Sequence, residues 1–332
     1  MLCTVNRGRT IRVSVGTAAA LGLVNVRCDV LPTTAYLLTT GGCVSRCAFC
    51  AQARSSNTSE ALLSRVSWPE FPIEQVLEAL VRGSSALQRV CIQVTSTPNA
   101  RNIAKEVVGN ILEIKQMYGA AYDISLSYHP SSVSDVESLL SLGVDRIGIA
   151  LDAATQRIHS KTKAGSGSWE STMDLLEESS TSFPHKISTH LIVGLGETEE
   201  ELVKIMQTLR DLGITVGLFA FTPIKGTPME HVPQPPLDVY RRVQIARYLI
   251  TMGQASAGDF TYVDGRISGV GPTHKFVERL LSTGDPFKTS GCPDCNRPYY
   301  NERPGGVIFN YPRPLREDEI RKCLLEARLE HV

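Results

Sequence analysis

The sequence lacks an excess of either charge, with 34 Lys and Arg residues against 34 Asp and Glu residues. Because no global positive field results, we expect binding to neither nucleic acid nor an anionic membrane surface. The chain also lacks an apolar run long enough to span a bilayer, a repeat at solenoid periods and a low-complexity tract. What remains is a globular protein of 332 residues, enough for one large α/β domain or two ordinary domains.

One interpretation of residues 1–26 is a signal peptide, because basic residues precede a mildly apolar stretch. Arg12, Asn25 and Arg27 interrupt that stretch, and its apolar core is weak. The cysteines further along the chain also suit a reducing compartment. We therefore expect a cytoplasmic protein.

Cysteine is the informative residue type, because its number is odd and a chain of this size does not need disulfides. Clustered cysteines in such a chain indicate metal binding rather than covalent bridges. The nine cysteines are Cys3, Cys28, Cys43, Cys47, Cys50, Cys91, Cys292, Cys295 and Cys323.

Between residues 34 and 222 the sequence alternates short apolar runs with amphipathic stretches. The apolar runs predict strands at residues 34–40, 89–95, 122–128, 145–151, 186–195 and 215–221. The amphipathic stretches predict helices at residues 73–87, 100–119, 134–143, 169–180 and 198–213. Thr198 and Glu201 form a capping-box pattern at the start of the last of these helices.

Strands that alternate with helices predict a parallel sheet, which right-handed crossovers curl toward a barrel. Six such units are fewer than the eight of a complete barrel, so we expect an α/β fold with a partial (β/α)6 TIM-like barrel. We place the barrel at residues 34–225, an N-terminal extension at residues 1–33 and a C-terminal extension at residues 226–332. The C-terminal part predicts helices at residues 237–253 and 316–332, and we expect it to close one end of the barrel.

Three cysteines follow the first predicted strand directly, in the loop where α/β barrels place their chemistry. Cys43, Cys47 and Cys50 can hold three irons of a 4Fe–4S cluster and leave the fourth iron open to a ligand. Phe49 would shield the cluster or lie beside a bound cofactor. The alternatives are buried core cysteines, which do not usually gather in a glycine-flanked polar loop, and a zinc knuckle, which usually has paired CxxC units.

Four motifs follow one another in a characteristic order: CAFCAQARSS, DRIGIALDAA, HLIVGLGETEEEL and FAFTPIKGTPME. With the CxxxCxxC spacing, they resemble the radical S-adenosylmethionine (SAM) superfamily, in its biotin synthase and lipoyl synthase branch. The resemblance covers about residues 34 to 230. It implies that the open iron binds the amino and carboxylate groups of SAM. Reductive cleavage of SAM would then give a 5′-deoxyadenosyl radical that abstracts hydrogen.

The resemblance also implies residues that contact the cofactor. Val193, Gly194 and Leu195 would flank its adenine and ribose, at the end of a strand and before a helix. An ordinary strand-to-helix turn closed by the capping box is the structural alternative.

Three further positions match the family's cofactor site. Asp152 would lie near the ribose hydroxyls, Lys163 near the methionyl carboxylate and Pro223 near the adenine. The structural alternatives are a helix cap for Asp152, a solvated surface lysine for Lys163 and a rigid turn for Pro223. His129, at the predicted barrel mouth, can contact substrate or be structural, and His190 can point into the barrel or into the helical layer.

The resemblance to biotin synthases implies a second, 2Fe–2S cluster held by three strand cysteines and an arginine. Cys91 matches one ligand, but the strand at residues 122–128 has no cysteine. Ser188 and Asp259 stand where another cysteine and the arginine belong. One ligand of four cannot hold that cluster. Biotin synthesis is therefore disfavoured, and we interpret Cys91 as a buried apolar cysteine.

Cys292 and Cys295 form a CxxC pair in a loop poor in apolar residues, which indicates a metal site. A zinc clip is the alternative. Lipoyl synthases carry an auxiliary 4Fe–4S cluster that donates sulfur, and the resemblance implies that Cys28 joins the pair in such a cluster. Cys323 is the other cysteine that could reach it, and Ser290 is a candidate non-cysteine ligand. The usual lipoyl synthase has three cysteines in a short N-terminal motif and a C-terminal serine ligand, and this chain has neither in that form.

The chain is most similar to the biotin-synthase-related proteins that form a two-protein, archaeal-type lipoyl synthase. That similarity implies sulfur insertion into an octanoyl chain on a lysine of a peptide or lipoyl-domain protein. It also implies a second radical SAM subunit and an electron donor such as ferredoxin. We expect the many barrel Val, Ile and Leu residues to suit an acyl chain. The alternatives are another radical SAM reaction on a small molecule, such as biotin-like sulfur insertion or a rearrangement, and a non-catalytic iron–sulfur accessory subunit.

Overall fold

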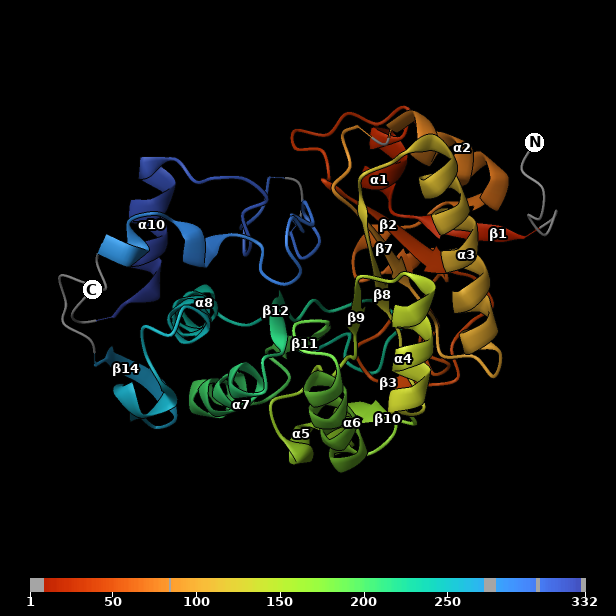
Figure 1. Cartoon of the computed structure of the whole chain (residues 1–332). Coiled ribbons are helices and arrows are strands. Elements are labelled where there is room, and N and C mark those ends of the chain that lie inside the picture. The colour runs from red at the N-terminus through yellow and green to blue at the C-terminus, as the bar shows by residue number, and fades with distance from the viewer. Residues whose placement is uncertain (1–8, 84, 272–278, 303–304, 330–332) are drawn as a thin grey trace.

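The computed structural model describes residues 9–83, 85–271, 279–302 and 305–329. Its centre is one curved sheet with the strand order β12-β11-β9-β8-β7-β2-β1-β6 (Figure 1). Six of these strands are parallel to their neighbours and follow one another in chain order. They are β2 (Thr34–Thr39), β7 (Arg89–Gln93), β8 (Asp123–Ser127), β9 (Arg146–Gly148), β11 (Ile187–Val193) and β12 (Thr215–Ala220). The predicted partial (β/α)6 barrel is confirmed.

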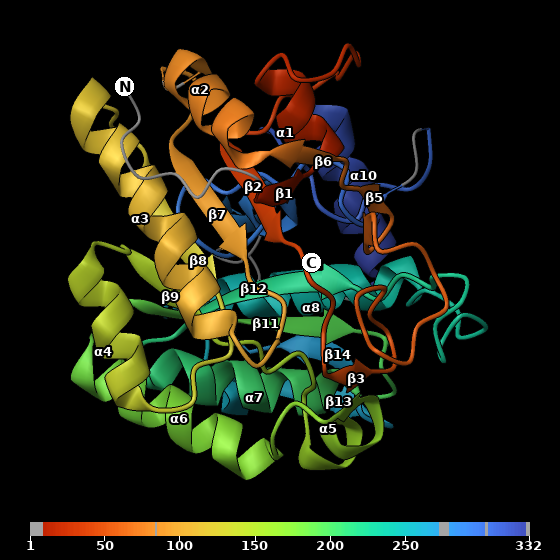
Figure 2. The same cartoon turned by 90° about the vertical axis from the view of Figure 1, so that its right-hand side faces the viewer.

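The helices between these strands lie along the outside of the curved sheet (Figure 2). They are α2 (Ile73–Gly83), α3 (Ala100–Tyr118), α4 (Val133–Leu142), α5 (Gln156–Thr162), α6 (Trp169–Ser182) and α7 (Glu199–Asp211). The capping box predicted at Thr198 and Glu201 starts α7, with both reciprocal hydrogen bonds present. Within the described residues, no helix combines the length and the apolar character needed to cross a membrane.

The residues before β2 extend the sheet, which the sequence pattern did not predict. Strand β1 (Thr10–Val13) pairs antiparallel with β2, and β6 (Glu70–Pro72) pairs antiparallel with β1. The short helix α1 (Val15–Ala20) follows β1. Two small two-stranded sheets lie outside the main one: β3 (Arg46–Cys47) with β10 (Lys163–Ala164), and β4 (Leu62–Leu63) with β5 (Val66–Ser67).

The strand side chains alternate between two environments, as the pleat of a strand requires. On β7, Val90 and Ile92 are fully buried in the main core, which packs against the outer helices. Cys91 and Gln93 point the other way and line the inside of the barrel. The aliphatic residues of the strands therefore stabilise the contact with the helices, while the barrel interior is lined by other residue types.

The C-terminal part packs on the β12 side of the barrel. Its elements are α8 (Leu237–Thr251), η1 (Ala257–Asp259), β13 (Phe260–Val263), β14 (Arg266–Val270), η2 (Asp285–Phe287) and α10 (Glu317–Ala327). Arg242 of α8 is fully buried and bonds Glu199 of α7 in a bidentate pair, while its Nη1 donates to the carbonyl of Ala327 at 2.9 Å. Buried, hydrogen-bonded charge pairs of this kind are costly to break, so α8 holds α7 and α10 together.

Residues 288–302, which we call the closing loop, span the gap between the two ends of the parallel sheet (Figure 1). At the free edge of β12, the backbone N–H of Leu218 donates to Ser290 Oγ at 2.9 Å, and Asn301 Nδ2 donates to the carbonyl of Ala220 at 2.9 Å. At the other side, the N–H of Thr33, next to β2, donates to Asn296 Oδ1 at 3.0 Å. The closing loop thus satisfies an exposed sheet edge and covers the open side of the partial barrel.

Candidate active site

The predicted cluster cysteines lie in a loop that is fixed at both ends. After β2, the N–H of Val44 donates to the carbonyl of Ser96 at 2.7 Å, and the N–H of Ala48 donates to the carbonyl of Thr162 at 2.7 Å. In the β3–β10 ladder, Cys47 lies opposite Lys163. These bonds hold the loop, residues 41–50, over the mouth of the barrel; we call it the triad loop.

The three thiols of the triad loop are free and partly buried. Burial, with a further contribution from the neighbouring thiol of Cys47, raises the pKa of Cys50 to about 12. Burial also raises the pKa of Cys47, while the ammonium of Lys163 opposes the shift. Thiols in this setting ionise readily only when a metal takes the place of the proton.

Three thiols in one loop can each bond a different iron of a 4Fe–4S cluster. Among the described residues, no group of three His, Cys, Asp or Glu side chains is arranged to hold a single metal ion. Cys43, Cys47 and Cys50 are the free thiols that would hold a cluster with one iron left open to a ligand.

Lys163 is buried beside the cluster loop, contrary to the surface alternative. Its side chain is 3% exposed, and its Nζ forms an ion pair with Asp152 Oδ2 at 3.0 Å. Asp152 has a positive φ of 63°, which is unusual for a residue with a Cβ. Hydrogen bonds to His190 and Ile192 of β11 hold it in that conformation. Strained residues that are held in this way often belong to functional sites.

The turn after β11 is shaped by Glu197. The N–H groups of Gly194 and Leu195 both donate to the Glu197 carboxylate, the second at 3.0 Å. Gly194 has a φ of 106°, and a Cβ there would lie 3.0 Å from Pro235 Cδ. The turn therefore needs glycine, and its two N–H groups are already bonded within the chain.

The predicted cofactor-contact residues divide between two environments. Val193 is buried in the main core, whereas Leu195 packs in a small apolar cluster with Ala153, Ile158 and Phe221. Phe49 of the triad loop packs against this same cluster. A flat apolar surface beside the triad loop suits the aromatic part of a nucleoside cofactor.

Pro223 begins the loop after β12, which touches the triad loop. The N–H of Met229 donates to the carbonyl of Ala48 at 3.2 Å, and the N–H of Asn57 donates to the carbonyl of Gly226 at 2.8 Å. A Cβ at Gly226 would lie 2.9 Å from the backbone N of Thr58, so this contact requires glycine. The loop supports the triad from behind, and Pro223 fixes its start.

A cavity of about 270 Å³ lies inside the barrel, and we call it the chamber. Phe49, Cys50 and Asp152 of the triad region line it. Cys91 of β7 lines it too, together with Cys292 and Cys295 of the closing loop. Thiols from the triad loop, a strand and the closing loop therefore line one cavity.

The lining of the chamber differs from the sequence-based expectation of an aliphatic interior. The valines, isoleucines and leucines of the strands mostly face the helices. The chamber is lined instead by aromatic and polar side chains, among them Tyr36, Trp68, Phe219, Gln93 and Ser188. Its shape and aromatic walls, rather than aliphatic strands, would hold an apolar chain.

The sequence left the roles of His129 and His190 undecided, and the structure describes the surroundings of both. His190 points into the chamber and lies edge-on to Phe219, with 5.2 Å between ring centroids. Burial lowers the pKa of His190 to about 4, so its ring is neutral at pH 7. Burial also lowers the pKa of His129, while its neighbour Tyr128 donates a hydrogen bond to Asp135 Oδ2 at 3.0 Å.

The second group of thiols has defined contacts. Tyr36 Oη and Cys295 Sγ are 3.3 Å apart, and Gln93 Nε2 donates to Cys91 Sγ at 3.1 Å. Cys292 Sγ lies 3.9 Å from the hydroxyls of both Ser125 and Ser188. Burial raises the pKa of Cys91 and of Cys295, and the loop thiols raise that of Cys91 further.

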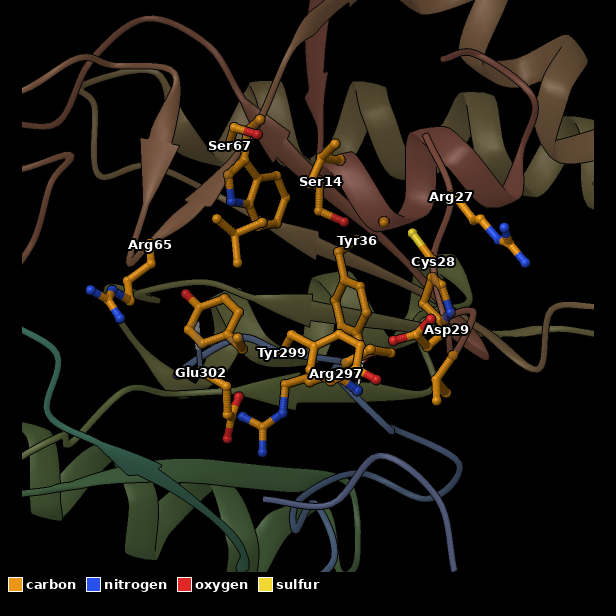
Figure 3. Close-up of a pocket in the computed structure, with 18 of the residues that line it drawn as sticks. Ser14, Arg27, Cys28, Asp29, Tyr36, Arg65, Ser67, Arg297, Tyr299 and Glu302 are labelled. Carbon is orange, nitrogen blue, oxygen red and sulfur yellow. Dashed lines mark hydrogen bonds between the residues drawn. The ribbon is translucent and has the colours of Figure 1, made fainter. Parts of the chain in front are cut away.

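The structure does not bring Cys28 together with Cys292 and Cys295. Cys28 lines a second cavity of about 410 Å³, the side cavity, beside Asp29 and Tyr299 (Figure 3). Cys323 is fully buried on α10, in the main core. Ser290 uses its hydroxyl to bond β12. The thiol that does lie beside Cys292 and Cys295 is Cys91, which the sequence led us to interpret as a core residue.

One signal in the sequence could have found Cys91. Cys91 lies two positions from both Arg89 and Gln93, and every second residue of a strand faces the same side of the sheet. Those two polar neighbours indicate that this face is not the aliphatic core. Its partners come from a loop about two hundred residues later, which no local pattern could reveal.

A model of the radical SAM superfamily matches residues 37–209. The partial barrel and the three-thiol loop at its mouth thus define a radical SAM domain, and this chain belongs to the radical SAM superfamily. Membership implies a 4Fe–4S cluster and SAM as cofactors, which Cys43, Cys47 and Cys50 are placed to serve.

Curated relatives carry names from sulfur chemistry. The chain is 26% identical over 195 residues to a biotin synthase of Aquifex aeolicus, covering 58% of this chain and 56% of that one. It is also 26% identical over 239 residues to the ribosomal protein uS12 methylthiotransferase RimO of Ralstonia nicotianae, covering 67% of this chain and 52% of that one. The chain therefore spans about half the length of these relatives.

Among solved structures, the chain is similar to HydG, described as a maturase of the FeFe-hydrogenase. The TM-score is 0.54 at 11% sequence identity, and the match covers 66% of this chain and 50% of HydG. At this identity the likeness concerns the fold alone.

Proposed function

We propose that this protein is a sulfur-inserting radical SAM enzyme, a component of a lipoyl synthase that acts on an octanoyl chain carried on a lysine. The observation that carries the proposal is the second group of thiols in the chamber. Cys292 and Cys295 face the same space as Cys50 of the triad loop. A hydrogen-abstracting site and a sulfur source must both reach one carbon chain, and a shared chamber allows that.

The reaction replaces a C–H bond by a C–S bond at an unactivated carbon. When bound, the cluster and SAM would supply the radical that removes the hydrogen atom, and an external reductant such as ferredoxin would supply the electron for SAM cleavage. An auxiliary cluster would supply sulfide and take up, at one of its irons, the electron released when the C–S bond forms. The chain's own residues hold and orient these groups: Asp152 and Lys163 form a buried charged pair beside the triad, and the closing loop covers the open side of the barrel.

The names of two relatives support chemistry at sulfur. Biotin contains a sulfur heterocycle, and a methylthiotransferase transfers a methylthio group. Biotin synthesis itself has less support, because Ser125 and Ser188, each 3.9 Å from Cys292 Sγ, lie on the strands where the biotin synthase pattern has cysteines.

The side cavity is the route that we assign to the substrate. It adjoins the chamber, and Tyr36, Trp68, Arg297 and Tyr300 line both spaces. Figure 3 shows Tyr36, Tyr299 and Arg297 inside it, with Arg65 on one side and Cys28 and Asp29 on the other. A mostly apolar passage with charged residues around it suits an acyl chain on a peptide, presented by a lipoyl-domain protein or an octanoyl-lysine peptide.

The route can be tested without disturbing either thiol group. Ser67 is exposed and lines the side cavity. Ser67→Trp should raise the KM for an octanoyl-lysine peptide severalfold and leave the iron content unchanged. A KM equal to that of the parent enzyme would exclude this passage.

The function is tested by anaerobic assay of the reconstituted protein with an octanoyl-lysine peptide, SAM and a strong reductant. The assay is run with and without a candidate second radical SAM subunit. We expect 5′-deoxyadenosine together with a thiolated octanoyl product, complete to lipoyl only when the partner is present. 5′-Deoxyadenosine without any thiolated product would favour another radical SAM reaction. No 5′-deoxyadenosine at all would favour an iron–sulfur accessory subunit.

A further inference from the structure

We infer that Cys91, Cys292 and Cys295 together form a second iron–sulfur site inside the barrel, without Cys28. The inference deepens the proposed function, since it names the sulfur store. It concerns metal content, so it can hold or fail independently of sulfur insertion.

The first support is convergence from two distant parts of the chain. Cys91 points inward from the middle of β7, and Cys295 packs with it against Tyr36 and Trp68 in one small buried cluster. Cys292 lines the chamber with them. None of these three cysteines is in a disulfide. A buried set of free thiols on a chamber wall is a poor hydrophobic core and a good ligand set.

The second support is the way in which the closing loop is built. Arg89 of β7 donates from its Nε to the carbonyl of Pro293 at 3.1 Å, which ties the CxxC turn to the strand that carries Cys91. Gly217 of β12 lies directly against the loop: a Cβ there would lie in ordinary contact, 3.4 Å from the carbonyl oxygen of Ser290. Asp294 has a positive φ of 63° within the CxxC turn. These features fix the loop thiols opposite β7 at the cost of local strain.

The third support is the charge around the thiols. Three thiolates on a sulfide cluster form an anionic group, and an anion in a buried site needs cationic neighbours. Arg89 is 3% exposed at its side chain and donates to Ser125 Oγ at 2.7 Å, next to Cys292. It also pairs with Asp123 Oδ2 at 2.9 Å, which balances part of its charge. Arg297 lies on the other side, its guanidinium 3.9 Å from the centre of the Phe219 ring. Its buried Nε has no hydrogen-bond partner among the described residues. A donor in that position can serve a cluster sulfide.

A cluster and a zinc ion differ in how their ligands are placed. Zinc needs all of its ligands to converge on one point. A multi-iron cluster places each thiolate on a separate iron. Three thiolates leave one iron without a cysteine, so a 4Fe–4S cluster here would resemble the triad cluster in its ligand count.

The inference is tested by metal analysis in a background that lacks the triad cluster. The full-length variant Cys43→Ala/Cys47→Ala/Cys50→Ala, reconstituted anaerobically, should retain about four irons and about four sulfides per chain. Its reduced form should give an electron paramagnetic resonance signal from one cluster. Adding Cys91→Ala should remove most of this iron and the signal. Adding Cys91→Ser should keep the fold and alter the signal.

Three controls separate ligand loss from misfolding. In the same background, Cys28→Ala, Cys323→Ala and Ser290→Ala should each retain about four irons, since none of these residues is part of the proposed site. Circular dichroism and thermal unfolding of every variant identify any that fail to fold. Loss of the cluster in Cys28→Ala together with its retention in Cys91→Ser and Cys91→Ala would overturn the inference. One zinc in place of iron would also overturn it. In the parent enzyme, with its triad intact, both clusters present and SAM cleaved but no sulfur inserted would instead contradict the proposed function.

Discussion

The two thiol groups of the chamber are assembled in different ways. The triad comes from one loop, in which Cys43, Cys47 and Cys50 lie within eight positions directly after β2. The second group combines a strand residue, Cys91, with the CxxC turn of the closing loop. The ligands of the first site all come from one loop, which bonds to Ser96, Thr162 and β10 hold in place. The second site exists only when the barrel has formed and the closing loop has sealed it.

This difference suggests a division of labour. A site on a single fixed loop keeps its geometry through many reaction cycles, as a cofactor site requires. A site shared between the barrel and a covering loop can be exposed or rebuilt when that loop moves. A sulfur store that is consumed in the reaction would need such access. The predictions below are arranged to test whether the two sites can be separated in this way.

The largest effect is expected at the triad. Replacing any one of Cys43, Cys47 or Cys50 with Ala should abolish SAM cleavage, because the remaining two thiols cannot hold the cluster that binds the cofactor. The measurement is 5′-deoxyadenosine formed per enzyme after reduction. Retained cleavage in any of these variants would show that this loop does not carry the radical chemistry.

A more selective effect is expected at the closing loop. Replacing both Cys292 and Cys295 with Ala should abolish sulfur insertion and spare SAM cleavage, since neither belongs to the triad loop that would bind SAM. Both products are measured in one assay. If cleavage is lost as well while the protein remains folded, the two sites are not separable and the two-site account is wrong.

An intermediate effect is expected at Lys163, which is buried against Asp152 beside Cys47. Lys163→Met should weaken SAM binding at least tenfold, because one charged hydrogen-bonding group is worth roughly 1.5–3 kcal/mol, or about 10- to 150-fold in affinity. Lys161→Met is the matched control, since Lys161 is exposed on the same segment. SAM affinity is measured by equilibrium binding to the reconstituted protein. Equal SAM affinities in the two variants would show that Lys163 does not contribute to SAM binding and is purely structural.

The smallest effect concerns the pH dependence of stability. Burial lowers the pKa of His190 to about 4 in the folded chain, below its ordinary value of 6.5. The unfolded chain therefore binds the proton first, and the free energy of unfolding should fall by up to about 3 kcal/mol as the pH drops from 6.5 to 4. His190→Phe should reduce this loss, while exposed His231→Gln should not. The free energy of unfolding is measured by denaturant unfolding at several pH values. An equal fall with pH in His190→Phe and in the parent would contradict this prediction.

The sequence predicted the parts of the molecule that depend on local pattern. The six strands, the capping box at Thr198 and the triad loop each follow from residues that are close together in the chain. The buried position of Lys163 could not be predicted, because it depends on β10 pairing with β3 across more than a hundred residues. The position of Cys91 beside the closing loop could not be predicted for the same reason, because the two are far apart in the chain.

The interior of the barrel shows the same limit. The many Val, Ile and Leu residues in the strands indicated an aliphatic chamber, yet alternation turns most of them toward the helices. Parity along a strand identifies which residues share a face. It does not identify which face lies inside the barrel, because that depends on the curvature of the whole sheet.

The central claim is that the chamber brings a carbon chain between a radical source and a sulfur store held by the protein. The most direct measurement is to reconstitute the enzyme with isotopically heavy sulfide, remove the free sulfide, and analyse the product from an octanoyl-lysine peptide by mass spectrometry. The account predicts a thiolated product that carries the heavy sulfur in a single turnover, and none from the Cys292→Ala/Cys295→Ala variant. A product without heavy sulfur, or 5′-deoxyadenosine with no thiolated product, would contradict it.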